Sequence, residues 1–219
     1  MIDITVLPAF IAASLVIILS PGADTVLLLR YAIRGGRRDG FLALIGILLG
    51  LTVVSGLLVS GVGVLVNTQP GALNLLTLLG TVVLFVLGAV SIAQAISLAR
   101  DHQVLEQDVL GRNGAVALTT QRPLLAALIT NATNPKVLIF YLAFFPQFVG
   151  NATSVTWQLV LLAIVFLVVA TLWLIPLVYA ASAMREFFAR PRVAIALEIT
   201  AGAVFLLLAT LLLISWVQL

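Results

Sequence analysis

The stretch LSPGADTVLLLRYAIRGGRRDG, residues 19–40, decides how the chain is expected to fold. Up to Leu19 the sequence is typical of a membrane-spanning helix. Pro21 and Gly22 then interrupt the pattern, and Asp24 stands among leucines. A proline removes a helical hydrogen bond and disfavours helix at the residue before it. A helix break beside a carboxylate, inside an apolar segment, therefore requires a specific explanation.

The composition is that of an integral membrane protein. Of the 219 residues, 63% are hydrophobic and 9% are charged, whereas soluble domains average about 25% charged residues. The chain has no cysteine and one histidine, His102, so it predicts no disulfide, metal site or cofactor. The net charge of +3 comes from arginines at loop positions and not from a clustered basic face. No nucleic-acid partner is therefore expected.

Six apolar segments are long enough to cross a bilayer, for which a helix needs about 20 mainly apolar residues. The predicted crossings are 4–29, 41–66, 72–99, 123–149, 155–184 and 194–217. The predicted fold class is therefore an all-α integral membrane protein, with one transmembrane domain over residues 1–219.

The arginines predict the orientation of these crossings, because Lys and Arg in short loops remain cytoplasmic. Ten of the eleven basic residues lie in the first, third and fifth connectors, and only Lys136 does not. Both termini are therefore expected outside the cytoplasm. The N-terminus has an acid and no basic residue, so the first segment is expected to be a retained span and not a signal peptide.

The six crossings divide into two halves of opposite orientation, about 1–99 and 123–219, joined by a cytoplasmic loop at 100–122. The first half contains SPGADT in its first crossing, and the second contains TNATNPKVLIFY in its first. Paired Pro/Gly-interrupted segments in inverted halves indicate a transporter binding site. We therefore predict a 3+3 inverted repeat in which helices 1 and 4 are broken at Pro21 and Pro135 and lie side by side.

Asp24 and Lys136 are the residues that most need a role, since either charge at a helix centre costs about 2.5–3.5 kcal/mol. The preferred hypothesis is a site for an amino-acid zwitterion, with its ammonium at Asp24 and its carboxylate at Lys136 or at a helix N-terminus. Asp24 would also carry a proton. The predicted substrate-binding residues are Ser20, Pro21, Gly22, Asp24, Thr25, Asn131, Asn134, Pro135 and Lys136. Two alternatives stay open: a buried Asp24–Lys136 pair that only fixes packing, and a simple proline kink with Lys136 reaching an interface.

The remaining crossings are expected to be scaffold. Gly46 and Gly50 have the GxxxG spacing that permits close helix approach, within a subunit or between two. Pro176 is expected to kink the fifth crossing. Glu198 lies near the predicted cytoplasmic end of the sixth crossing, and we expect an interfacial or helix-start acid there more than a coupling site.

The quoted stretch, extended to Gly50, and NATNPKVLIFYLAFFPQFV at 131–149 together resemble the LysE/RhtB family of bacterial amino-acid exporters, the LysE-type translocators. The family pattern in the first motif is Pro-Gly-Pro followed by Asn or Asp, and Ala23 replaces its second Pro here. Asn134, Pro135 and Lys136 match the second motif in full. The resemblance implies proton-driven efflux of amino acids across the bacterial inner membrane, and it is compatible with a homodimer.

Three other functions compete with export of amino acids. One is a transporter of another small solute or ion within the same superfamily; for a metal, the absence of cysteine and the few intramembrane carboxylates speak against it. A membrane enzyme lacks support, because the sequence has no nucleophile–base pair and no Gly-rich phosphate loop. A scaffold that does not transport would have no need of Asp24 and Lys136. The sequence therefore predicts an exporter, and not an enzyme, that works by alternating access, and the family resemblance implies that protons drive it.

Overall fold

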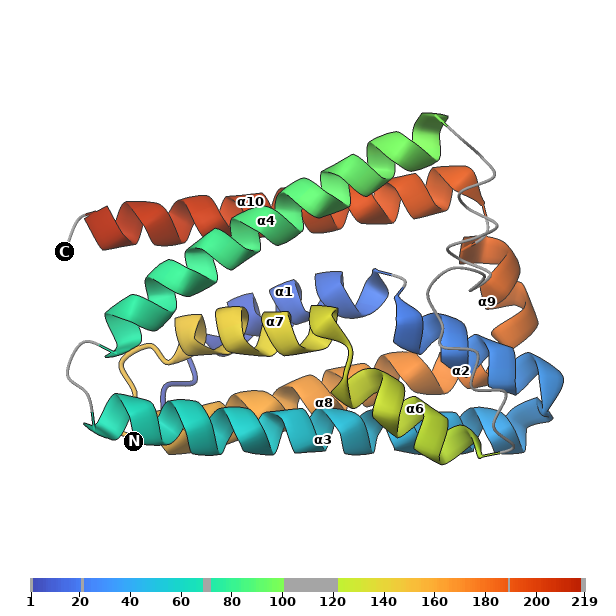
Figure 1. Cartoon of the computed structure of the whole chain (residues 1–219), viewed down its shortest axis with the longest axis horizontal. Helices are drawn as coiled ribbons and strands as arrows, with labels where there is room; N and C mark the ends of the chain where they lie inside the picture. The colour runs from blue at the N-terminus through green and yellow to red at the C-terminus, as the bar shows by residue number, and fades with distance from the viewer. Residues whose placement is uncertain (1, 21, 69–71, 101–121, 189, 218–219) are drawn as a thin grey trace.

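The computed structural model describes residues 2–20, 22–68, 72–100, 122–188 and 190–217, and no β-strand occurs among them. The elements are helices α1 (Leu7–Leu19), α2 (Ala23–Arg34), α3 (Gly36–Thr68), α4 (Ala72–Arg100), α6 (Pro123–Ala132), α7 (Pro135–Phe144), the 3-10 helix η1 (Phe145–Phe148), α8 (Val155–Tyr179), α9 (Ala181–Phe188) and α10 (Pro191–Val217) (Figure 1). The prediction of an all-α protein is confirmed. Most of the predicted loop 100–122 lies outside the described residues.

Four helices within the described part of the chain are long and apolar enough to cross a membrane. They contain the segments Gly36–Val62, Leu78–Arg100, Val155–Tyr179 and Pro191–Ile214. α1 and α2, bent by 57° at their junction, would make a fifth crossing if they form one span. α6 and α7 have 10 residues each, about 15 Å of helix, so neither crosses alone. The predicted number of six crossings therefore stays a prediction.

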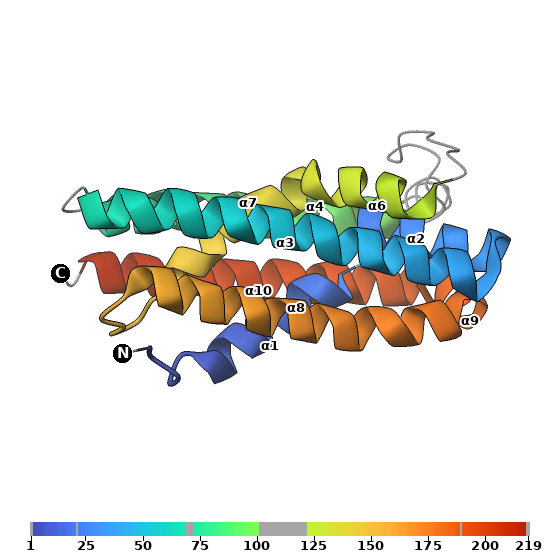
Figure 2. The same cartoon turned by 90° about the horizontal axis from the view of Figure 1, so that it is seen from below.

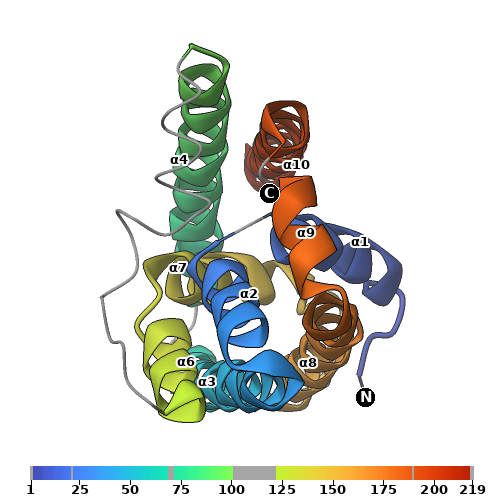
Figure 3. The ribbon, with the colours of Figure 1, turned by 90° about the vertical axis from the view of Figure 1, so that its right-hand side faces the viewer.

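The helices form a group around an interior, with one helix pair beside it. α3 packs against α2, α6 and α8, and α4 packs against α10. Figure 2 shows α3 and α8 running along the length of the molecule. Seen from the end in Figure 3, α3, α6 and α8 lie around α2, while α4 and α10 stand to one side.

The outer faces of the long helices are apolar, as a lipid bilayer requires. On α4, Phe85 and Val86 are each 55% exposed, and Leu172 on α8 is 68% exposed. Exposed apolar side chains of this number are unusual for a soluble protein. A helix that is hydrophobic all round belongs either in a core or in a membrane. These surfaces therefore fit contact with lipid.

Two predicted boundaries are wrong. Residues 30–40 were expected to form a loop, but α2 continues to Arg34 and α3 begins at Gly36. Arginine is a good helix former, and the chain reverses at Gly36, whose φ of +72° suits glycine. The predicted crossing 155–184 ends at Tyr179, because the helix stops one turn after Pro176, where the N–H of Ala180 donates to the Pro176 carbonyl.

Glycines let α3 approach α6 within one chain, which settles the role left open for the GxxxG pair. A Cβ at Gly46 would collide with the backbone carbonyl of Leu124, and a Cβ at Gly50 would lie 2.6 Å from Oδ1 of Asn131. The prediction of close helix approach is confirmed. This contact also brings Asn131 of the second motif against α3.

Candidate substrate site

The chain leaves the helical conformation at both predicted motifs. Ser20 follows α1 with φ −66° and ψ 117°, and Asn134 precedes α7 with φ −69° and ψ 112°. Both values are extended, as expected for residues that precede proline. Pro21 itself lies outside the described residues, so its part in the break stays a prediction. Pro135 is the first residue of α7, where a missing N–H costs nothing.

The break between α6 and α7 satisfies its own backbone. The N–H of Asn134 donates to the carbonyl of Asn131 at 3.1 Å, so the carbonyl that Pro135 cannot serve finds a local partner. The side chain of Asn134 caps α7 by accepting from the N–H of Lys136 at 3.0 Å. The side chains of this motif are therefore its available polar groups, because the carbonyl of Asn131 is already bonded.

Asp24 connects the two motifs through its side chain. Its Oδ2 accepts from Nδ2 of Asn131 at 3.0 Å and from Nδ2 of Asn134 at 3.1 Å. Asp24 lies in the first turn of α2, where the helix dipole favours an anion. Its Oδ1 is buried and has no hydrogen-bond partner among the described residues. One oxygen thus fixes the carboxylate, and the other stays without a partner among the described residues.

Lys136 contacts the residues of the other helix break, which lies between α1 and α2. Its Nζ donates to Oγ of Ser20 at 2.9 Å, and its stem passes Gly22, where an added Cβ would lie 4.0 Å from Cδ of Lys136. The ammonium therefore bonds to Ser20 and not to Asp24. This arrangement does not support the alternative of a direct ion pair, nor that of Lys136 reaching an interface.

The expectation that Glu198 is an interfacial acid is wrong. It is 7% exposed, on α10, and its Oε1 accepts from Oγ of Ser20 at 3.4 Å. α10 begins at Pro191, two turns earlier, so position 198 lies well inside the helix. The predicted crossing begins at residue 194, which puts Glu198 near its end. Because α10 begins earlier than that, the residue lies deeper in the helix than predicted.

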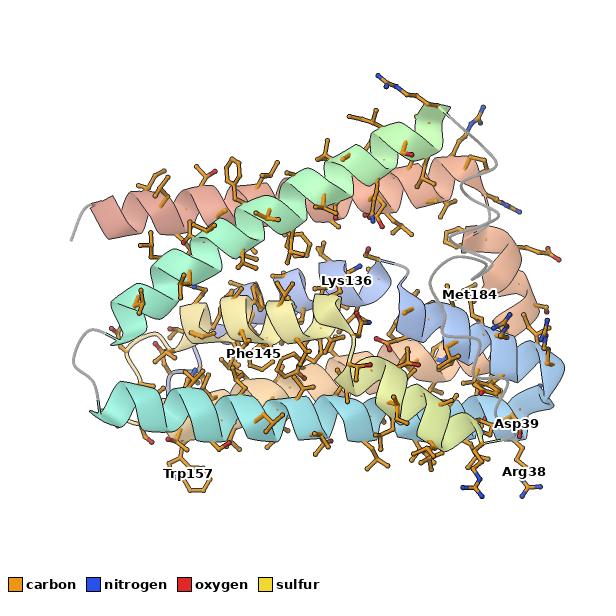
Figure 4. The ribbon with its side chains drawn as sticks, viewed as in Figure 1. Arg38, Asp39, Lys136, Phe145, Trp157 and Met184 are labelled. Carbon is orange, nitrogen blue, oxygen red and sulfur yellow. The ribbon has the colours of Figure 1, made fainter. Side chains whose placement is uncertain are left out.

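The residues of both motifs line one cavity of about 80 Å³. Figure 4 shows Lys136 near the middle of the long axis of the molecule. Seven of the nine predicted site residues line this cavity: Ser20, Gly22, Asp24, Thr25, Asn131, Asn134 and Lys136. Pro21 is not described, and Pro135 contributes the start of α7.

The rest of the cavity wall is apolar, and sequence reasoning missed it. It is formed by Ile17 and Ile18 of α1, Ile47 and Leu51 of α3, Val137, Phe140 and Tyr141 of α7, and Phe166, Ala170 and Leu174 of α8. In a chain so rich in apolar residues, no sequence pattern separates these from residues that face lipid. The cavity therefore combines a polar end with an apolar pocket.

An aromatic cluster packs at the end of the cavity formed by α7. Phe140 stacks on Phe144 with ring centroids 4.4 Å apart, and Tyr141 stacks on Phe145 at 4.3 Å. The Tyr141 hydroxyl is hydrogen-bonded to that of Ser55 at 3.1 Å. Stacked aromatic pairs stabilise a protein beyond the effect of their buried area. These rings therefore hold this wall of the cavity in place.

A substitution at Gly50 is expected to disturb the site from outside it. In Gly50→Ala the new methyl group would push Asn131 away from Asp24. We expect the melting temperature of the protein to fall by several degrees, because overpacking costs about 1–3 kcal/mol. Thermal unfolding of the purified protein would measure this. Gly56→Ala is the matched control on the same helix, since nothing lies within 4 Å of its added Cβ. A melting temperature of Gly50→Ala equal to that of Gly56→Ala would contradict the packing role of Gly50.

Apolar helices that hold half-buried charged side chains around a cavity are typical of a membrane transport protein, since charges inside a membrane mark substrate or ion pathways. The chain belongs to the LysE type translocator family, whose model matches residues 15–216. The sequence resemblance to this family is thus confirmed over nearly the whole chain.

Several curated relatives are leucine efflux proteins. The one from Klebsiella pneumoniae subsp. pneumoniae is 32% identical over 140 residues, which are 64% of this chain and 61% of the relative. The one from Salmonella choleraesuis is 31% identical over 144 residues, again 61% of its length. In Enterobacter sp. (strain 638) the relative is 26% identical over 179 residues and 80% of its length. No solved structure matches the chain.

Proposed function

We propose that this chain exports amino acids from the bacterial cytoplasm in exchange for protons. Membership of a translocator family and similarity to leucine efflux proteins support transport of an amino acid. The observation that carries the proposal is the cavity, in which a carboxylate with a free oxygen and a lysine ammonium come from two separate helix breaks.

An aliphatic amino acid fits the chemistry of this cavity. Its ammonium would bind Oδ1 of Asp24. Its carboxylate would replace Ser20 as the hydrogen-bond partner of Lys136. Both bonds join ionised groups in a low-dielectric site, where such hydrogen bonds are strong. Its side chain would lie against the apolar wall from α3, α7 and α8. Leucine has the charged end and the apolar side chain that this division requires.

Competition at Asp24 would couple the substrate to a proton. The carboxylate can bind an ammonium group only when ionised, so a bound proton and a bound amino acid exclude each other there. An amino acid would leave the cell on the ionised carrier, and the carrier would return with Asp24 protonated. Mutually exclusive binding at one site is the basis of antiport.

The proposed transport cycle uses six crossings, with α1–α2 and α6–α7 as the two broken spans of a 3+3 inverted repeat. Alternating access would then move the halves around the breaks. The start of α1 and the end of α10 lie at the same end of the molecule in Figure 1, and Arg38 lies at the opposite end in Figure 4. This placement supports an inner-membrane protein with cytoplasmic arginines and both termini outside.

The orientation can be measured by labelling single cysteines, because the natural chain has none. Arg38→Cys and Asn151→Cys replace exposed residues of the two opposite ends. We expect a membrane-impermeant thiol reagent to label position 151 in intact cells, and position 38 only after the membrane is opened. The reverse result would overturn the proposed orientation and leave the fold untouched.

Transport itself is tested with protein reconstituted in vesicles. A pH gradient should drive accumulation of labelled leucine, and unlabelled leucine should exchange with it when no gradient is present. Alanine, lysine and an inorganic cation serve as alternative substrates that identify the pocket. If none of the amino acids moves while an inorganic ion does, the proposed function is wrong.

A further inference from the structure

Lys136 faces a second acid that the proposed transport step does not use. A hydrogen-bonded chain runs from its Nζ to Oγ of Ser20 at 2.9 Å, and from Ser20 to Oε1 of Glu198 at 3.4 Å. It joins α7, the end of α1, and α10.

Glu198 is buried and only partly bonded. It is 7% exposed, and its Oε2 has no partner among the described residues. A buried carboxylate is costly unless it is paired with a positive charge. Lys136 is the positive charge within reach, through Ser20. Glu198 is absent from the cavity wall itself, so it would act on the substrate only through Lys136.

The charges of the proposed cycle show where Glu198 is needed. With an amino acid bound, its carboxylate pairs with Lys136 and its ammonium pairs with ionised Asp24, so both protein charges are balanced without Glu198. On the return step the site is empty and Asp24 is protonated. Among the described residues, Glu198 is then the ionised acid that faces Lys136, through Ser20.

We propose that Glu198 is the counter-ion of Lys136 in the empty carrier, and that it permits the return step of the transport cycle. It is a positioning residue that holds the lysine side chain through Ser20 until a substrate carboxylate replaces it. The proposal rests on the function proposed above and adds a residue from α10 to the machinery.

Two transport measurements separate this role from a structural one. Net export requires the empty carrier to return, whereas exchange of internal for external leucine does not. In Glu198→Gln the amide can keep the hydrogen bond to Ser20 but has no charge. We expect net export to fall by about tenfold or more, because an unbalanced ammonium must return through the membrane. Exchange should stay at the wild-type rate or exceed it.

The control and the contrary outcomes follow from the same assay. Glu186→Gln, at an exposed position of α9, should leave both rates unchanged. If Glu198→Gln lowers exchange as much as net export, or lowers neither, the proposal is wrong. A wild-type protein that moves no amino acid in either assay would instead overturn the proposed function.

A second variant keeps the proposal testable if Glu198→Gln does not accumulate in the membrane. The double variant Glu198→Gln with Lys136→Met removes both charges, so it should restore the amount of folded protein. Continued loss of the protein would show that position 198 contributes packing alone, and would overturn the counter-ion role.

Discussion

Asp24→Asn is expected to abolish leucine transport while the chain stays folded in the membrane. The new side chain oxygen can still accept from Asn131 and Asn134, which keeps the link between the two motifs. Its NH₂ group, however, would face the cavity where the substrate ammonium binds. Two donors repel each other there, and the loss of a hydrogen bond to a charged group alone is worth about 1.5–3 kcal/mol, or about 10–150-fold in affinity.

The measurement is leucine exchange and net export in vesicles, with thermal stability of the purified protein as the check on folding. Unlike Glu198→Gln, this variant should lose exchange as well as net export, because Asp24 is proposed to touch the substrate in every step. Asp39→Asn, an acid in the first turn of α3 away from the cavity, is the control. Transport by Asp24→Asn near the wild-type rate would show that the acid has only a structural role.

The polar part of the site could be predicted from the sequence because the background is apolar. Asp24, Asn131, Asn134 and Lys136 stand out in segments where a polar group is costly unless buried with a partner. Proline marks the same places, since it kinks or breaks a helix. Ser20 and Lys136 are 116 positions apart in the sequence. These two signals were sufficient to place both in one predicted cluster.

The apolar part could not be predicted, because the physical signal that normally finds a core is missing in a membrane protein. On α8, Phe166 and Ala170 face the cavity, while Val168 and Leu172 are exposed. All four are apolar, since contact with lipid and contact with the cavity both favour apolar residues. Only the packing of α8 against α3 and α1 decides which face is inside.

Glu198 shows a different limit of the sequence. A single acid near the end of an apolar segment has the same pattern whether it meets lipid headgroups or a buried partner. The difference lies in where α10 begins and in what packs beside it. Ser20 reaches Glu198 across 178 positions of sequence, and nothing in either local sequence indicates that contact.

Lys136→Met is expected to remove recognition of the substrate carboxylate and to leave recognition of the ammonium intact. Methionine keeps the apolar stem that passes Gly22 but has no charge. The affinity for leucine should fall by about 10–150-fold, the value of a hydrogen bond to a charged group. The affinity for 3-methylbutylamine, which is leucine without its carboxylate, should not change, because this amine has nothing to bind at Lys136.

Competition by leucine and by the amine against labelled leucine exchange would measure both affinities in the wild type. Direct binding to the purified variant measures them where exchange is too slow. The variant also leaves Glu198 buried without a cation, so its stability should fall by about 3–5 kcal/mol and should recover when Glu198→Gln is added. An equal loss of affinity for leucine and for the amine would place Lys136 in the framework of the cavity. A loss confined to leucine would assign it the carboxylate, which is the result we expect.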